Sequence, residues 1–205
     1  ESGTQRPPFA FMWRYIGAWH GAIDWQELQP VDEYLSHQSA GIIGLPAELQ
    51  VRHVKTDNLR LFSVAESASF SDRDPLLWTG LGFITGLEDH VEFVQGAYPT
   101  QVDPASGVPA VISRALAERM GLQVGERYLL FATGSEGAQI PIRIAAVWQP
   151  LDAADPFWFY RPDTFDELIL TSEEAFVQQV APVLEKPVAQ ALWYQVLDGD
   201  RKSVV

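Results

Sequence analysis

Hydrophobic residues in the first quarter of the chain follow two different spacings. Apolar and aromatic residues dominate 9–16 without helical spacing, which is typical of a buried strand. After Asp24 the apolar residues recur at nearly helical spacing, and Glu27 completes a capping box with Asp24, so a helix is predicted here. Pro30 lies inside this segment, and because proline removes a backbone donor, two short helices also fit the pattern. The apolar positions of the predicted helix are Leu28, Val31, Leu35 and Ile42.

Three extended segments follow this helix. Residues 49–56 alternate between two sets of side chains, as a strand does, and a polar turn then leads into a second strand at 59–64. A third strand is predicted at 76–84. The Ser-rich stretch 66–74 between the last two strands is expected to be a surface loop.

The middle of the chain predicts a compact unit of strand, helix and hairpin. A short strand at Val111-Ile112 precedes a helix that ends at Met120, with Ser113 as its N-cap. Two further strands, 127–132 and 140–148, form the hairpin.

Glycines occur in this unit at the positions where the backbone must reverse direction. Gly121 is predicted to be the left-handed C-cap of the helix, and Gly125 is predicted to allow the tight turn into the next strand. Gly134 and Gly137 mark the hairpin turn.

The last part of the chain predicts a capped helix and a final strand. Thr171 or Ser172 caps the helix, which Pro182 kinks or shortens, and 188–197 is the strand. The apolar face of this helix consists of Phe176, Val180, Val183 and Leu184.

The order of these elements predicts an α+β fold made of two subdomains. Without the middle unit, the order is strand, helix, strand, strand, helix, strand (βαββαβ), as in a ferredoxin-like layer. We therefore predict a discontinuous ferredoxin-like subdomain of residues 1–95 and 151–205, with a small, mainly β subdomain of residues 96–150 inserted in it.

The charge and the length of the chain disfavour several classes of partner and function. The chain has 205 residues, with 27 acidic against 14 basic side chains and a formal net charge of -13, which disfavours nucleic acid and anionic bilayer surfaces as partners. Cysteine is absent, so disulfides and cysteine-ligated metals are excluded. This absence fits an extracytoplasmic and a cytoplasmic location equally well. The longest apolar stretches are far shorter than the roughly 18 residues of a membrane helix. The chain starts without an initiator Met or signal-peptide pattern, and we expect both ends to be cut points in a longer protein.

Residue types suited to catalysis or metal binding occur without a recognised spacing. The acidic cluster around His90 matches no zinc or calcium pattern and is expected to be a solvated loop. The glycines at 80, 82 and 86 do not form a dinucleotide loop, because the third comes one position late; a bulge or a close backbone approach in a strand is favoured. Ser135 lies in a predicted turn and lacks the context of a nucleophile elbow. The other candidates weighed are Glu88, Asp89, Glu92, His20, His37, His53, Asp152 with Asp155, and Asp163 with Asp166. We expect no catalytic residue, no cofactor and no metal site.

The run Phe157, Trp158, Phe159, Tyr160 is the most unusual local feature. An extended chain would direct these aromatic side chains to both of its faces. Packing between the two subdomains is the favoured interpretation, and contact with a lipid or a partner protein is the alternative.

One stretch of the chain resembles a known family. Residues 111–126 (VISRALAERMGLQVGE) resemble the extracytoplasmic domains of ABC transporter permeases of the FtsX/MacB/LolC type, in which a strand, a short Ala-rich helix and a Gly-Leu-x-x-Gly-acid turn lead into a strand. Residues 142–147 are similar to the next strand of the family, although Ala146 replaces the usual glycine. Two flanking stretches also resemble the family, Val94–Pro99 and Asp155–Phe159. Together these segments fall within residues 94–159 of the chain.

The resemblance implies a porter-like subdomain that carries an inserted sabre-like subdomain, held between the first two membrane helices of a permease. It implies a mechanical role on the extracytoplasmic side of the bacterial cell membrane, coupling ATP-driven movement of membrane helices to a substrate, a lipid or a partner. The implied partners are a cognate ABC ATPase subunit, a second permease subunit in a homo- or heterodimer, and a lipid, lipoprotein or extracytoplasmic protein. The alternatives are a free-standing ligand-binding or adhesion protein and, less favoured, a carboxylate-based hydrolase.

Overall fold

The strands of the protein join into one mixed sheet. The computed structural model describes residues 9–64, 74–132 and 137–199. Within these ranges the sheet has 11 strands in the order β1-β11-β2-β5-β10-β7-β9-β8-β3-β4, with β6 paired to β9. The strands are β1 (Ala10–Ile16), β2 (Ala47–Lys55), β3 (Leu59–Ser63), β4 (Leu77–Thr79), β5 (Leu81–Ile84), β6 (Val91–Gly96), β7 (Val108–Ser113), β8 (Arg127–Phe131), β9 (Gln139–Pro150), β10 (Ile169–Leu170) and β11 (Gln190–Leu197). The helices are α1 (Gly17–His20), α2 (Trp25–His37), α3 (Ser39–Ile43), α4 (Leu87–His90), α5 (Arg114–Met120) and α6 (Glu173–Ala175), with 3-10 turns at Pro104–Ser106 and Pro162–Phe165 and a π-helical turn at Phe176–Val180. The α+β class predicted from the sequence is therefore correct.

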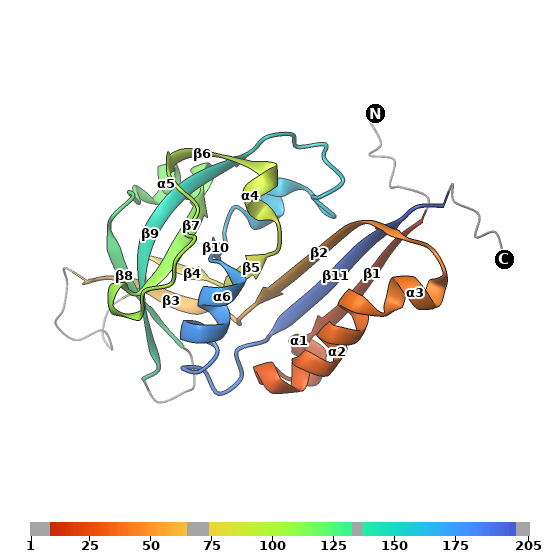
Figure 1. The fold of residues 1–205 in the computed structure, drawn as a ribbon. Helices are drawn as coiled ribbons and strands as arrows, with labels where there is room; N and C mark the ends of the chain where they lie inside the picture. The colour runs from red at the N-terminus through yellow and green to blue at the C-terminus, as the bar shows by residue number, and fades with distance from the viewer. Residues whose placement is uncertain (1–8, 65–73, 133–136, 200–205) are drawn as a thin grey trace.

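The molecule has two parts that differ in shape. Figure 1 shows β1, β11 and β2 as a long ribbon with α2 and α3 along one side, whereas β3, β4 and β6 to β9 curl into a compact part. We call the first part, with α1 to α3, the arm, and the rest the body. The strand β5 joins them, because it pairs antiparallel with β2 of the arm and parallel with β10, which in turn pairs with β7.

The helix α2 starts as its sequence predicts and is not interrupted, but Val31 and Ile42 of the predicted apolar face are exposed. Asp24 is its N-cap and accepts a hydrogen bond from the Glu27 amide at 2.7 Å. Leu28 and Leu35 are buried against the sheet, whereas Val31 is exposed. The helix continues through Pro30, so the alternative of two helices broken at this proline is wrong.

The first strand is not the fully buried strand that its composition indicates. In the described residues β1 pairs only with β11, so it forms an edge of the sheet. Its side chains are half-buried or exposed, and Phe11 is among the exposed ones. An edge strand in the thin arm cannot be covered on both faces, which is why a continuous apolar pattern overestimates its burial.

The ferredoxin-like arrangement is not confirmed. The segment 59–64, expected beside the strand at 49–56, forms β3 and instead pairs with β4 and β8 in the body. The place beside β2 is taken by β5. Strand pairing is non-local, so the order of elements along the chain could not reveal this exchange. The division into residues 1–95 with 151–205 and residues 96–150 stays a prediction, and pairings such as β3 with β8 cross those boundaries.

The middle unit folds as its local signals predict. Ser113 caps α5 by accepting a hydrogen bond from the Leu116 amide, and β8 pairs antiparallel with β9. Gly121 has φ 69° and Gly125 has φ 94°, both in the left-handed region. The hairpin turn at Gly134 and Ser135, like most of the Ser-rich stretch 66–74, lies outside the described residues.

The last helix ends before Pro182, which confirms the predicted alternative of a shortened helix. Ser172 caps α6, which continues as the π-helical turn and ends at Val180, two residues before Pro182. Phe176 and Val180 are buried, whereas Val183 of the predicted apolar face is exposed.

Candidate functional site

The four aromatic residues 157–160 lie where the body meets the arm, and we call them the aromatic junction. Phe157, Trp158 and Phe159 are buried, with only 4% of Trp158 exposed. Trp158 stacks on Trp148 of β9 with ring centroids 5.7 Å apart. Its indole Nε1 donates to the Asp152 carbonyl oxygen at 3.1 Å, so the polar edge of the ring is satisfied.

The other side of the junction contacts the arm. Phe159 lies 5.9 Å from the Tyr194 ring of β11 and 6.4 Å from the His53 ring of β2, measured between centroids. Arg14 of β1 donates to the Tyr160 hydroxyl at 2.9 Å. The junction therefore packs between the two parts of the molecule, and its first three rings are not an exposed partner surface.

His90 fixes the loop before the junction. Its Nδ1 lies 2.7 Å from Asp155 Oδ2, and its ring stacks on Phe157 at 3.9 Å between centroids. The neighbouring Glu88 and Asp89 do not join this pair: among the described residues, no group of three or more His, Cys, Asp or Glu side chains is arranged to hold a metal ion. The His90 contact thus positions a loop.

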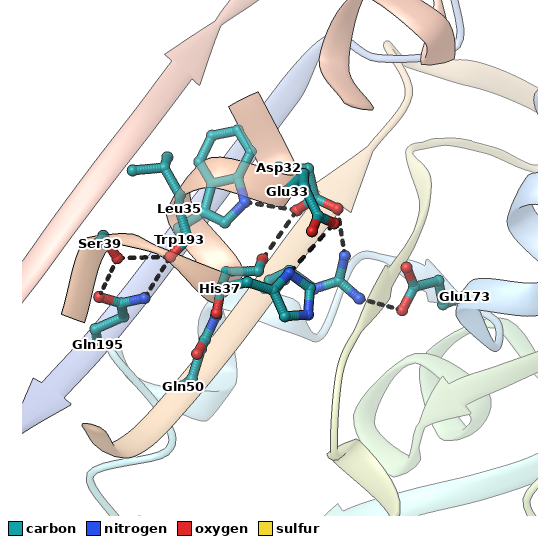
Figure 2. Close-up of polar contacts among 11 residues, drawn as sticks. Asp32, Glu33, Leu35, His37, Ser39, Gln50, Glu173, Trp193 and Gln195 are labelled. Atoms are coloured by element: carbon teal, nitrogen blue, oxygen red, sulfur yellow. Dashed lines mark hydrogen bonds and ion pairs between the residues drawn. The ribbon is translucent and has the colours of Figure 1, made fainter. Parts of the chain in front are cut away.

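A second contact between arm and body is polar and centres on Arg52. The guanidinium pairs with two carboxylates, both labelled in Figure 2: Asp32 of α2, 2.5 Å away, and Glu173 of α6. Asp32 also accepts a hydrogen bond from the Trp193 indole at 2.7 Å. One side chain of β2 therefore connects the arm helix α2 to the body helix α6.

Further along α2, amide side chains attach the end of the helix to the sheet (Figure 2). Gln195 of β11 donates to the Leu35 carbonyl at 2.6 Å, and its Oε1 accepts from Ser39 at 2.9 Å. Gln50 of β2 donates to the Ser36 carbonyl at 2.9 Å. Local sequence patterns do not predict these contacts, because Gln50 and Arg52 bond to helix residues that lie 14 or more positions away in the chain.

An apolar groove of about 830 Å³ lies between α2 and the strands of the arm. Aromatic and aliphatic side chains form its walls. They include Trp13, Tyr15, Leu28, Val31, Tyr34 and Trp193.

The start of β1 and the end of β11 lie side by side at the tip of the arm. The Leu197 amide donates to the Phe9 carbonyl at 3.0 Å, and the Asp198 amide donates to the Pro46 carbonyl at 2.9 Å. Figure 1 shows this tip at the end of the ribbon remote from the body. Whatever segments continue the chain at these two points leave from neighbouring positions.

The remaining candidates have structural partners. Asp152 accepts from the Ala154 amide at 2.8 Å, within a turn. Asp163 pairs with the exposed Arg161 at 2.8 Å. Burial raises the pKa of Asp166, whose backbone oxygen accepts from Ser113 at 3.1 Å. Gly86 has φ 76° at the start of α4 and belongs to a turn.

Within the described ranges, no helix combines the length and the apolar character needed to cross a bilayer.

Comparison with known proteins gives matches only at the level of structure. No family model matches the chain, and no curated protein matches its sequence. The structure is similar to the periplasmic region of MacB from Actinobacillus actinomycetemcomitans, at 10% identity and a TM-score of 0.47, over 96% of this chain and 78% of that one. It is also similar to a domain described as a permease domain from Porphyromonas gingivalis, at 17% identity and a TM-score of 0.43, over 82% of this chain and 63% of that one. The chain thus spans less than two thirds of the length of the second of these proteins.

Proposed function

We propose that this chain is the extracytoplasmic domain of a bacterial ABC transporter permease of the FtsX/MacB type, without catalytic residues of its own. In this role it transmits ATP-driven movement of membrane helices to a substrate, a lipid or a partner outside the cytoplasm. The observation that carries the proposal is the pairing of β1 with β11 at the tip of the arm. Two membrane segments that enter and leave there would be neighbours, as a domain inserted between consecutive membrane helices requires.

The strand-helix-strand unit of β7, α5 and β8 supports the same assignment. Its capped helix, its left-handed Gly121 and the turn at Gly125 are the features on which the sequence resemblance rests. A porter-like subdomain with an inserted sabre-like subdomain remains part of this proposal.

The two contacts between arm and body suit a mechanical role. A movement applied at the tip of the arm reaches the body through the aromatic junction and through Arg52, because both join buried or half-buried groups of the two parts. Packed interiors transmit displacement because they have few voids.

The proposed partners follow from this role. They are a cognate ABC ATPase subunit, reached through the membrane region, and a second permease subunit. A lipid, lipoprotein or extracytoplasmic protein is the third kind of partner, and the apolar groove beside α2 is a surface of suitable chemistry.

The proposal is tested on the product of the complete gene. Expressed with its neighbouring genes and a purification tag, it is expected to need detergent for extraction and to copurify with an ATPase subunit. Extraction in aqueous buffer without detergent, and without an ATPase, would contradict the proposal and favour a free-standing binding protein.

A further inference from the structure

A second cavity, of about 240 Å³, lies beside the aromatic junction, between the arm strand β2 and the loop that follows the junction. Its polar lining includes Lys55, Thr164, Glu167 and Gln190, and its apolar lining includes Phe159 and Leu168. The volume is below the roughly 300–1,000 Å³ of pockets that hold drug-sized molecules. It therefore suits a small ligand.

Lys55 is the distinctive residue of this cavity, because it is the one lysine or arginine among the described residues that line it. Among the described residues, its ammonium makes no hydrogen bond and no ion pair, although burial lowers its pKa and Asp57 offsets part of this shift. The stem of the side chain passes over two glycines: a Cβ built on Gly82 would overlap with the Lys55 Cβ and the Val54 carbonyl, and one on Gly80 would lie 3.5 Å from Lys55 Cδ. These glycines thus leave the room in which the lysine runs along the cavity.

Two residues with neutral donor groups line the same space. Gln190 and Thr164 both belong to the cavity lining, and no hydrogen bond joins either side chain to another described residue. A cation and two uncommitted donors form a set that an anionic oxygen acceptor satisfies.

The opposite side of the cavity adds no further positive charge. His53 contributes to the lining, but its Nδ1 lies 3.0 Å from the Phe83 carbonyl and burial lowers its pKa to about 4, so the ring is neutral at pH 7. Glu167 brings a negative charge to the rim, where it pairs with Arg119 at 3.1 Å. One cation beside one carboxylate favours a ligand with a single negative charge over a doubly charged phosphate.

We propose that this cavity binds a small monocarboxylate, with the ligand carboxylate on Lys55, Thr164 and Gln190 and its apolar part against Phe159 and Leu168. The proposed site is inferred from the residues that line the cavity and does not depend on the permease assignment.

Benzoate is the probe, and benzamide is its neutral counterpart of nearly the same shape. Titration of the ¹⁵N-labelled chain at pH 7 is expected to give saturable shifts of the amides of Thr79, Gly80 and Gln190, with a dissociation constant below about 10 mM for benzoate. Benzamide is expected to bind at least about 10-fold more weakly, which corresponds to about 1.4 kcal/mol.

Two lysine variants make the test specific. Lys55→Met is expected to weaken benzoate binding at least about 10-fold, whereas Lys186→Met, at an exposed lysine, leaves it unchanged. If Lys55→Met does not fold, as judged by the dispersion of its spectrum, Lys55→Gln takes its place. Equal affinity for benzoate and benzamide, binding that survives both Lys55 variants, or no saturable shifts with benzoate would each overturn the proposal.

Discussion

At the residue scale, substitution of Trp158 tests whether the aromatic junction is an internal contact. Because the ring is buried and stacks on Trp148, Trp158→Ala should lower the free energy of unfolding by about 3–5 kcal/mol, measured by urea denaturation. Trp19→Ala is the matched control: this tryptophan is 75% exposed, and its truncation should change stability by no more than about 0.5 kcal/mol. Equal effects of the two substitutions would mean that the junction is not part of the core.

Substitution of Gly121 tests the backbone conformation of the middle unit. A Cβ at this position meets no atom within 4 Å, so Gly121→Ala suffers only from its left-handed φ of 69° and should cost about 1 kcal/mol or more. Gly41, inside α3, also has nothing within 4 Å, but no positive φ is found there, so Gly41→Ala should stabilise the chain by up to about 1 kcal/mol. The same urea measurement distinguishes them, and a neutral Gly121→Ala would contradict the assigned turn.

His53 makes stability depend on pH. Burial lowers its pKa from 6.5 to about 4, so the unfolded chain binds a proton at a higher pH than the folded chain does. The stability that neutral His53 provides is complete above pH 6.5 and is lost as the pH falls toward 4, by about 3 kcal/mol. In His53→Gln the decrease in unfolding free energy between pH 7.5 and pH 4 should be smaller by that amount. An unchanged decrease would show that His53 is accessible to protons in the folded state.

At the element scale, Arg52 should couple α2 to the sheet energetically. The Arg52 and Asp32 side chains are only 18% and 16% exposed, so a double-mutant cycle with Arg52→Met and Asp32→Asn should give a coupling of about 1–3 kcal/mol. The pair Arg114 and Glu118, 57% and 66% exposed, is the control and should couple by about 0.5 kcal/mol or less. A coupling for Arg52 no larger than that of the surface pair would mean that the Arg52–Asp32 pair does not hold α2 on the sheet.

Local sequence signals predicted where the helices begin better than they predicted which strands pair with each other. The caps at Asp24, Ser113 and Ser172 could be read because each depends on a hydrogen bond within three residues of the cap. The pairing of β3 with β8 could not be read, since it joins segments more than 60 residues apart. Similarly, the contacts of Arg52 in β2 with Asp32 and Glu173 could not be read from the alternating pattern, because these partners lie 20 and 121 residues away in the chain.

The candidate sites show the same limit. The run 157–160 was visible as an unusual composition, and the glycines at 80 and 82 were interpreted as a bulge or a close backbone approach. Their connection could not be foreseen: the glycines make room for Lys55, and the cavity beside it is lined in part by Phe159 and Tyr160 of the junction. Only the fold brings these three segments together.

At the scale of the whole molecule, the account requires the body to stand outside the cytoplasm while the tip of the arm faces the membrane. The chain contains no cysteine, so a single introduced cysteine can report its side of the membrane. The most direct test is Lys186→Cys in a cysteine-free version of the full-length protein, labelled in intact cells, with a permeable outer membrane where one exists, by a maleimide that cannot cross the cell membrane. The account predicts labelling before cell lysis to the same extent as after it. Labelling only after lysis would place the domain in the cytoplasm and contradict the account.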